Sequence, residues 1–162
     1  MQYVADSGSA AIALAAATAT TCLMVKSSST ISGQLVELGV FFDGVTASNT
    51  PVLIELVKST NATNSTPGTG NTSVTPVQAR GDGNTTGSGV AATFTAFAAC
   101  TSEPTVLTVV KRFLVPPTSG LLYQAPLGRE AAIIPSMGLG VRVTAPQTVD
   151  VRAYMEFIQG PS

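Results

Sequence analysis

Residues 139–158, with the sequence LGVRVTAPQTVDVRAYMEFI, contain the clearest structural signal in the chain. Apolar and polar side chains alternate in LGVRV and again in VDVRAYMEF, which is the period of a β-strand with one buried face. Both apolar faces can reach a single hydrophobic core. The stretch therefore predicts two amphipathic strands of a two-layer β fold, joined by a short connection.

We expect these two strands to pair as a hairpin. A shift of one residue would turn every side chain to the other face, so only every second register keeps both apolar faces on the core. The register that pairs Val143 with Val149 also sets Arg142 opposite Asp150, and oppositely charged cross-strand neighbours are favoured. Residues 145–147 are then the loop of the predicted hairpin.

Strand-like runs recur along the rest of the chain. They comprise two short runs within residues 9–27, then residues 34–42, 51–59, 74–79, 90–99, 105–115, 121–123 and 131–134. Residues 51–59 (PVLIELVKS) are apolar on both faces, which predicts a central strand covered on both sides. With about nine or ten strands and long polar loops, the pattern predicts an all-β fold, an antiparallel β-sandwich of the jelly-roll type.

The 162 residues are predicted to form one sandwich domain. Residues 1–21 are assigned to an N-terminal arm that includes the first strand, and residues 22–162 to the domain itself. Residues 61–89 are nearly all Gly, Ser, Thr, Asn and Pro, and this low-complexity insert buries too little apolar surface to offset its ordering entropy alone. We therefore expect the insert to be either mobile or ordered by a neighbouring molecule, and it is the first candidate for a contact surface.

Charged residues make up only 10% of the chain, against about 25% in typical globular proteins. Scattered Ser, Thr, Gly and Asn can keep a monomer soluble, or neighbouring subunits can cover much of the exterior, since interface centres are depleted in charge. We favour the second interpretation. The net charge of −1 and the dispersed Lys and Arg predict no direct nucleic-acid partner, and the lack of an apolar run of about 18 residues predicts no membrane span.

The chain contains no histidine. This excludes the Ser-His-Asp and Cys-His catalytic arrangements and the common zinc sites, and we expect no cofactor and no enzymatic activity. Glu37 and Glu55, on neighbouring predicted strands, are the least implausible catalytic pair of carboxylates, although solvent exposure or ion pairing explains each of them better. Cys22 and Cys100 each lie in an apolar run, as free buried cysteines do, and the sequence leaves a disulfide between them open.

Arg129 and Glu130 form the one charged pair in an otherwise uncharged stretch, residues 121–134 (LLYQAPLGREAAII). The pair is either a local ion pair, which contributes little when exposed, or an anchor at a subunit contact, where arginine is enriched. Both interpretations stay open at the level of sequence.

Three blocks together resemble a family of small virion proteins of tailed bacteriophages, the capsid-decoration or head-cement proteins. The blocks are LVELGVFFDGVTASNTPVLIELVKST, LLYQAPLGREAAII and LGVRVTAPQTVDVRAYMEFI. The resemblance implies a β-sandwich without enzymatic activity that sits on the outer surface of the capsid, binds the major capsid protein and forms trimers at local three-fold positions. A phage tail protein (tube or fibre) and a host-surface or carbohydrate-binding sandwich are the alternatives.

We expect subunit or capsid contacts in three segments, residues 1–21, 61–89 and 121–130. The candidate contact residues are Tyr3, Val4, Ile12, Leu14, Tyr123, Pro126, Leu127, Arg129 and Glu130. An N-terminal arm and polar loops can supply such a contact by ordering on binding, and a sheet edge can do so by strand addition.

Overall fold

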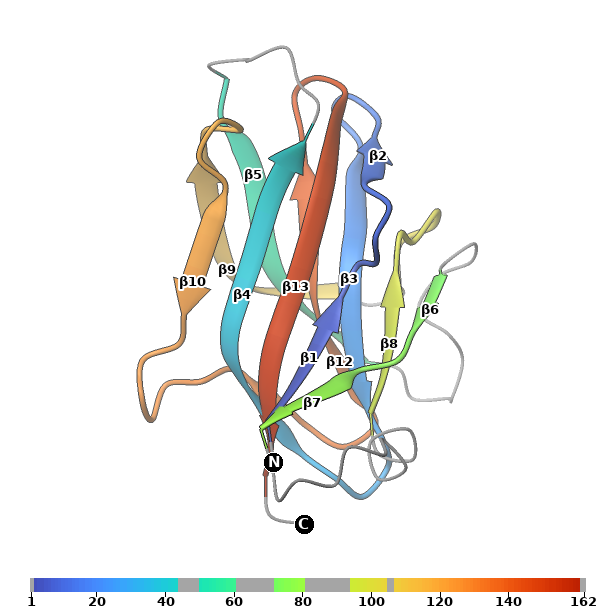
Figure 1. The fold of residues 1–162 in the computed structure, drawn as a ribbon, viewed down its shortest axis with the longest axis vertical. Helices are drawn as coiled ribbons and strands as arrows, with labels where there is room; N and C mark the ends of the chain where they lie inside the picture. Colours follow the sequence, from blue (N-terminus) through green and yellow to red (C-terminus); the bar gives the residue numbers. More distant parts are fainter. Residues whose placement is uncertain (1, 44–49, 61–71, 81–93, 105–106, 161–162) are drawn as a thin grey trace.

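The computed structural model describes residues 2–43, 50–60, 72–80, 94–104 and 107–160, and within these ranges the protein consists of thirteen β-strands without a helix. The strands are β1 (Gln2–Asp6), β2 (Ile12–Leu14), β3 (Ala19–Ser27), β4 (Gly33–Asp43), β5 (Val52–Thr60), β6 (Thr72–Val74), β7 (Val77–Arg80), β8 (Phe94–Ala98), β9 (Leu107–Val115), β10 (Leu121–Gln124), β11 (Ala132–Ile133), β12 (Met137–Thr144) and β13 (Val149–Gln159). They form two antiparallel sheets packed against each other, which confirms the predicted β-sandwich (Figure 1).

The seven-stranded sheet has the order β10-β4-β13-β1-β7, with β11 also pairing with β4 and β2 with β13. The six-stranded sheet has the order β6-β8-β3-β12-β5-β9. β1 and β2 pair with the same strand, β13, one after the other along its length. They therefore act as a single strand that is interrupted at residues 7–11.

The pairings follow a simple rule once the short strands β6, β7, β8 and β11 are set aside. The first strand (β1 with β2) pairs with the last, β13, and the second, β3, pairs with the second-to-last, β12. In the same way β4 pairs with β10, and β5 pairs with β9. A chain folded double into a ribbon and then wrapped around the sandwich has these pairings, and this is the jelly-roll topology.

The hairpin predicted for β12 and β13 is wrong. β12 lies between β3 and β5 in the six-stranded sheet, whereas β13 belongs to the seven-stranded sheet. Arg142 is therefore opposite Glu55 of β5, and Asp150 is opposite Asp43 of β4. Alternation correctly placed both apolar faces on one core, but it fixes only which face is buried and leaves the partner strand open. In a jelly roll these two strands pair with earlier strands, and residues 145–148 cross from one sheet to the other.

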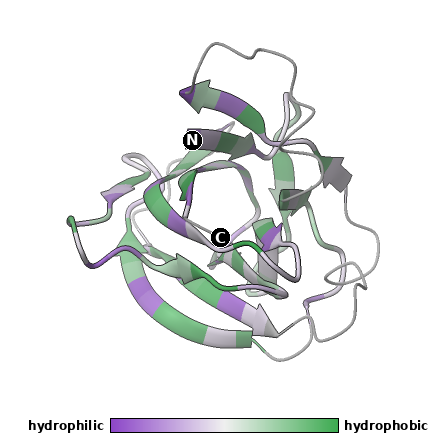
Figure 2. Cartoon of the chain, turned by 90° about the horizontal axis from the view of Figure 1, so that it is seen from below, coloured by the Kyte–Doolittle hydropathy of each residue, from purple (hydrophilic) through white to green (hydrophobic). Residues whose placement is uncertain are grey.

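The core lies between the two sheets and takes side chains from both. Phe157 of β13 packs against Phe94 of β8, with ring centroids 4.9 Å apart, and against Tyr3 of β1, with centroids 5.9 Å apart. Figure 2 shows hydrophobic and hydrophilic residues alternating along several strands, as expected when one face of each strand is buried. Aromatic rings from three strands thus join the two sheets at this point.

Most predicted strand runs are present, with shifted ends. β5 lies between β12 and β9, so it is an interior strand of its sheet, next to the edge strand β9. The predicted cover on its outer face is provided at Glu55 by the paired Arg112 and Arg142. The run predicted at residues 74–79 is divided into β6 and β7 around Thr75 and Pro76, since proline has no N–H to donate to a ladder. Strands of two or three residues, such as β2, β6 and β11, raise the number above the nine or ten expected. Strands this short contain too few residues to show the alternation of apolar and polar side chains in the sequence.

Candidate functional site

Exposed hydrophobic side chains gather along β9 and β10. These are outermost strands of the six-stranded and the seven-stranded sheet, and they lie on the same side of the sandwich (Figure 1). Of the seven exposed large hydrophobic side chains in the described part of the chain, four come from these strands and the loop after β10. They are Val110 (38% exposed), Leu114 (71%), Leu122 (58%) and Leu127 (96%). Val110 and Leu114 lie on the outer face of the six-stranded sheet and Leu122 on the outer face of the seven-stranded sheet, because the rings of their neighbours Phe113 and Tyr123 face each other between the sheets. We call this edge of the sandwich, with its exposed side chains on both faces, the β9–β10 side.

The β9–β10 side also has open strand edges. Among the described residues, β9 pairs with β5 alone and β10 pairs with β4 alone. Between the two strands the sandwich is closed by side chains, because the rings of Phe113 and Tyr123 lie 5.3 Å apart. The Lys111 ammonium lies 4.5 Å from the centre of the Tyr123 ring and donates a hydrogen bond to its hydroxyl. The core is sealed here, while each outer edge presents N–H and C=O groups that another chain can pair with.

Three of the predicted contact residues lie in the core. Tyr3 and Leu14 are 1% exposed, and Ile12 is 9% exposed. The contact prediction for these three residues is therefore wrong. The physical reason is that β1 and β2 pair with β13, which turns their apolar side chains inward instead of offering them to a partner. Val4, on the other face of β1, is half-buried.

The predicted contact segment after β10 is at the surface. Pro126, Leu127 and Arg129 are exposed, and Tyr123 and Glu130 are half-buried. The amide of Arg129 donates a hydrogen bond of 2.9 Å to the carbonyl of Pro126, which makes a tight turn with Leu127 at its tip. The third residue of this turn is a glycine, as its φ of +78° requires. Among the salt bridges of the described residues none joins Arg129 to Glu130, so the local ion-pair interpretation has no support.

Most of the low-complexity insert predicted to be a contact surface, residues 61–71 and 81–89, lies outside the described residues. The described part of the insert forms β6 and β7, which extend the six-stranded sheet beside β8 and the seven-stranded sheet beside β1. Val77 of β7 is 68% exposed at the end of the seven-stranded sheet that is remote from β10. Val77 is thus an exposed aliphatic residue, comparable with the leucines of the β9–β10 side, but it lies on a different side of the molecule.

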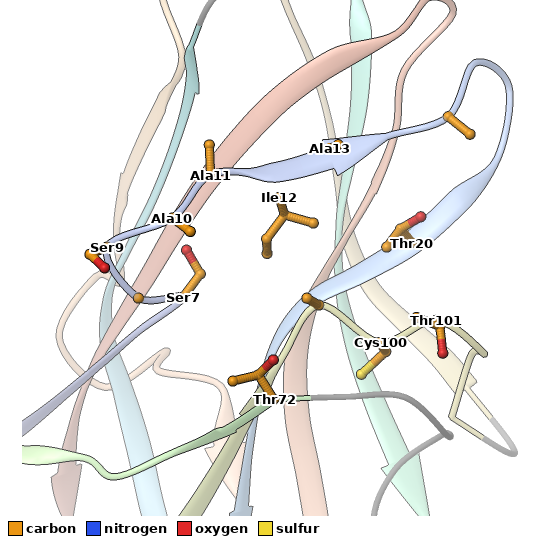
Figure 3. Close-up of a pocket in the computed structure, with 13 residues that line it drawn as sticks. Ser7, Ser9, Ala10, Ala11, Ile12, Ala13, Thr20, Thr72, Cys100 and Thr101 are labelled. Atoms are coloured by element: carbon orange, nitrogen blue, oxygen red, sulfur yellow. The ribbon is translucent and has the colours of Figure 1, made fainter.

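A cleft of about 650 Å³ opens between β2 and the segment that follows β8 (Figure 3). Of the 13 residues that line it, 11 are Ala, Gly, Ser or Thr, and the other two are Ile12 and Cys100. These walls offer hydroxyl and backbone groups and carry no charge. The cleft is therefore suited to contact with uncharged groups.

No disulfide joins the two cysteines, which resolves the question that the sequence left open. Cys22 and Cys100 are both buried. Burial, together with the nearby charge of Glu103, raises the pKa of the Cys100 thiol to about 11, and burial also raises the pKa of Cys22 well above its usual range. Because the thiolate is the reactive form of cysteine, both side chains behave as small buried hydrophobic groups.

Glu55 is the centre of a charged cluster on the outer face of the six-stranded sheet. Its carboxylate accepts hydrogen bonds from Arg142 at 2.6 Å and from Arg112 at 2.9 Å. Burial alone would raise the pKa of Glu55, but the hydrogen bonds from these arginines outweigh burial and hold the pKa below its usual range. Arg142 also lies 4.0 Å from Glu103, which accepts hydrogen bonds from Thr21. The cluster ties β3, β12, β5 and β9 together across the sheet.

Glu37 and Glu55, the carboxylates considered as a catalytic pair, are not neighbours, and Glu55 instead pairs with arginines, as the sequence interpretation favoured. Glu37 lies on β4 of the seven-stranded sheet and Glu55 on β5 of the six-stranded sheet. In a jelly roll these consecutive strands belong to different sheets, so proximity in the sequence does not make them neighbours. Glu37 is instead opposite Glu156 of β13, a pairing that spacing alone does not reveal.

Aromatic rings lie beside Glu37 on the outer face of the seven-stranded sheet. The ring of Tyr154 is 6.2 Å from the ring of Phe41, with the two planes 17° apart, and Phe41 is 44% exposed. Glu37 accepts hydrogen bonds from the Tyr154 hydroxyl and, at 2.9 Å, from Gln124. These bonds, that of Tyr154 foremost, lower the pKa of Glu37, while burial and the neighbouring carboxylates raise the pKa of Tyr154 to about 12. At neutral pH the carboxylate is therefore charged and the phenol protonated.

No family model, curated protein or solved structure matches this chain. Within the described residues there is no helix of the length and hydrophobicity that crossing a membrane requires. The same residues contain no group of three or more His, Cys, Asp or Glu side chains placed to hold a metal ion. The candidate sites are accordingly the surfaces described above.

Proposed function

We propose that this protein is a non-enzymatic structural protein of a tailed-phage virion, which decorates and stabilises the outer surface of the capsid shell. In this role it binds the major capsid protein and assembles as a trimer. The observation that carries the proposal is the β9–β10 side, where exposed leucines lie beside open strand edges. The sequence resemblance to capsid-decoration proteins indicates the setting in which such a surface would be used.

The β9–β10 side has the properties of a protein contact. Leu114, Leu122 and Leu127 are each more than half exposed, and full burial of a leucine gains about 1.5–3 kcal/mol. Stable contacts bury about 800 Å² per partner around an apolar centre with few charges. The leucines offer apolar area on both faces of this edge, and the outer edges of β9 and β10 can add main-chain hydrogen bonds to a strand of the partner.

The proposal is tested by binding of the purified protein to capsid shells that lack it. Sedimentation measures the bound fraction, and cryo-electron microscopy locates the bound copies. We expect density on the outer surface of the shell at three-fold or quasi-three-fold positions. Density confined to the tail of the virion would favour the tail-protein alternative, and a lack of binding to any part of the particle would refute a structural role.

Variants of the β9–β10 side assign the contact. Replacing two exposed leucines together, Leu122→Asn with Leu127→Asn, is expected to weaken shell binding about ten-fold or more, because each loses apolar area that the contact would bury. The matched control is Val77→Asn, whose side chain is 68% exposed, between the values of the two leucines, and lies on β7 at the other end of the seven-stranded sheet. An equal loss of binding in the control would refute the assignment of the contact to the β9–β10 side.

A further inference from the structure

We propose that the outer face of the seven-stranded sheet binds a neutral saccharide, with a pyranose ring over Phe41 and Tyr154 and with its hydroxyls bonded to Glu37 and Glu156. The site lies on β4 and β13 and borders β10, where Leu122 is opposite Gly39. It is built from the two rings and the two carboxylates, so it adds a second binding activity that does not rest on the proposed decorating role.

The sheet holds the aromatic part of this site in a fixed position. Tyr154 is opposite Gly39 of β4, and a Cβ placed at Gly39 would lie 2.7 Å from both Cδ1 and Cζ of the tyrosine ring. The ring therefore lies across the glycine, in space that any other residue would fill. Phe41, two residues further along β4, continues this surface with its ring plane 17° from that of Tyr154. Two nearly parallel rings form a platform of fixed geometry.

Hydrogen-bond acceptors lie next to the platform. Glu37 and Glu156 are directly opposite each other, and cross-strand neighbours have Cβ atoms about 4.5–5.5 Å apart. Glu156 accepts a hydrogen bond of 2.5 Å from Gln2, and Glu37 accepts bonds from Tyr154 and Gln124, so both carboxylates are held in place. Each carboxylate oxygen has two lone pairs, which leaves both groups able to accept further hydrogen bonds. The site is therefore rich in acceptors beside a flat apolar surface.

A pyranose matches this combination of groups. One face of the sugar ring presents C–H bonds, whose partial positive charge suits the negative face of an aromatic ring. Its hydroxyls are donors that can bond to both carboxylates. Because like charges directly opposite each other are destabilising, donors that bridge Glu37 and Glu156 relieve a repulsion that is present in the free protein.

The charges around the platform favour a neutral ligand. Glu37 and Glu156 lie at one end of the ring pair and repel an anion. Arg152 is opposite Phe41 at the other end, where it donates hydrogen bonds to the carbonyl of Ser9 and, at 3.4 Å, to Asp43. The positive charge of Arg152 at this end disfavours a cationic group from a protein partner. A saccharide without charged groups meets neither repulsion.

The test is an NMR titration of the full chain with maltohexaose, cellohexaose and mannohexaose, with trigalacturonic acid as the anionic counterpart and an arginine-rich peptide as the protein-like one. We expect at least one neutral hexasaccharide to shift the amide signals of β4 and β13 near Phe41 and Glu156. Trigalacturonic acid and the peptide are expected to bind more weakly.

Variants locate the site and give the result that overturns the proposal. Phe41→Ala is expected to reduce the affinity between about two-fold and ten-fold, the range that a single aromatic contact contributes. Glu37→Gln is expected to reduce it as well, and the exposed Val77→Ala on the other end of the sheet is expected to leave it unchanged. The amide spectra also report whether each variant is folded. The proposal is overturned if none of the three neutral sugars causes shifts at millimolar concentration, or if only the peptide does.

Discussion

Leu14 and Leu127 offer a direct test of where the N-terminal segment belongs. Both are leucines, but Leu14 on β2 is 1% exposed and Leu127 is 96% exposed. If residues 1–21 were an arm that meets a partner, Leu14→Ala would weaken the contact and leave the fold intact. The structure predicts the reverse, because Leu14 is opposite Val149 and belongs to the hydrophobic core.

The size of the effect follows from burial. Truncating a buried leucine to alanine removes its transfer free energy and leaves a cavity, which together cost about 2–5 kcal/mol. In a protein of this size each kcal/mol lowers the melting temperature by about 2–4 °C, so Leu14→Ala is expected to lower it by about 4–20 °C. Leu127→Ala changes an exposed side chain, and its effect on stability is expected to stay within about 0.5 kcal/mol.

Urea unfolding monitored by circular dichroism measures both free energies of unfolding. Shell binding, measured below the melting temperature of each variant, supplies the second readout, and only Leu127→Ala is expected to weaken it. A loss of less than about 1 kcal/mol for Leu14→Ala would refute the placement of β2 in the core. Weakened shell binding by a fully folded Leu14→Ala would restore the arm interpretation.

Three other results are expected. The pKa of Glu55 is held below its usual range, so its ion pairs stabilise the fold above about pH 4.3, the ordinary glutamate pKa. This stabilisation is lost as the pH falls through the lowered pKa. In the variant Glu55→Gln the melting temperature should therefore depend less on pH in that acidic range. Gly39→Ala should displace the Tyr154 ring at a cost of about 1–3 kcal/mol, seen in urea unfolding and in the tyrosine ring signals, and an unmoved ring would contradict the close approach. Cys100, with its pKa raised to about 11, should react with Ellman's reagent at pH 8 far more slowly in the native protein than in urea, and equal rates would show that the thiol is accessible.

Alternation along single strands was the part of the fold that the sequence predicted best. The buried faces of β12 and β13 were identified correctly, since Leu139, Val143, Val149 and Phe157 are all in the core. The partner strands were not, because a register argument compares only the two strands it assumes to be neighbours. Charge complementarity was a sound principle for Arg142, but its opposite charge is Glu55 on β5, more than 80 residues earlier in the chain.

The candidate site was predicted only in the segment 121–130, which was selected for its charged pair Arg129 and Glu130 in an otherwise uncharged stretch. Leu127 lies in this segment and is the most exposed of the large hydrophobic side chains in the described residues. Leu114 was missed, because in the run TVLTVVKRFLV most residues are apolar and no alternation distinguishes the two faces. Glu156 was missed for the reason that applies to strand order in general, since its position opposite Glu37 depends on long-range pairing.

Most of the few charged residues of the chain have bonding partners within the molecule. Of the eight Lys and Arg and nine Asp and Glu, ten make polar contacts within the described part of the molecule. These are Asp6, Glu37, Asp43, Glu55, Glu103, Lys111, Arg112, Arg142, Arg152 and Glu156. They lie mainly on the outer faces of the two sheets, where they join neighbouring strands.

A charge that is already bonded within the molecule does not have to be stripped of free water when a partner approaches, and stripping an unpaired charge is the costly step in forming a contact. On the β9–β10 side, Arg112 is paired with Glu55 although its side chain is 66% exposed, and Lys111 is bonded to the Tyr123 hydroxyl. The ion pair of Arg112 lowers the electrostatic cost of covering the neighbouring leucines. Because the chain has few charges and most of them are bonded within the molecule, burial of this apolar side against a second protein is favoured.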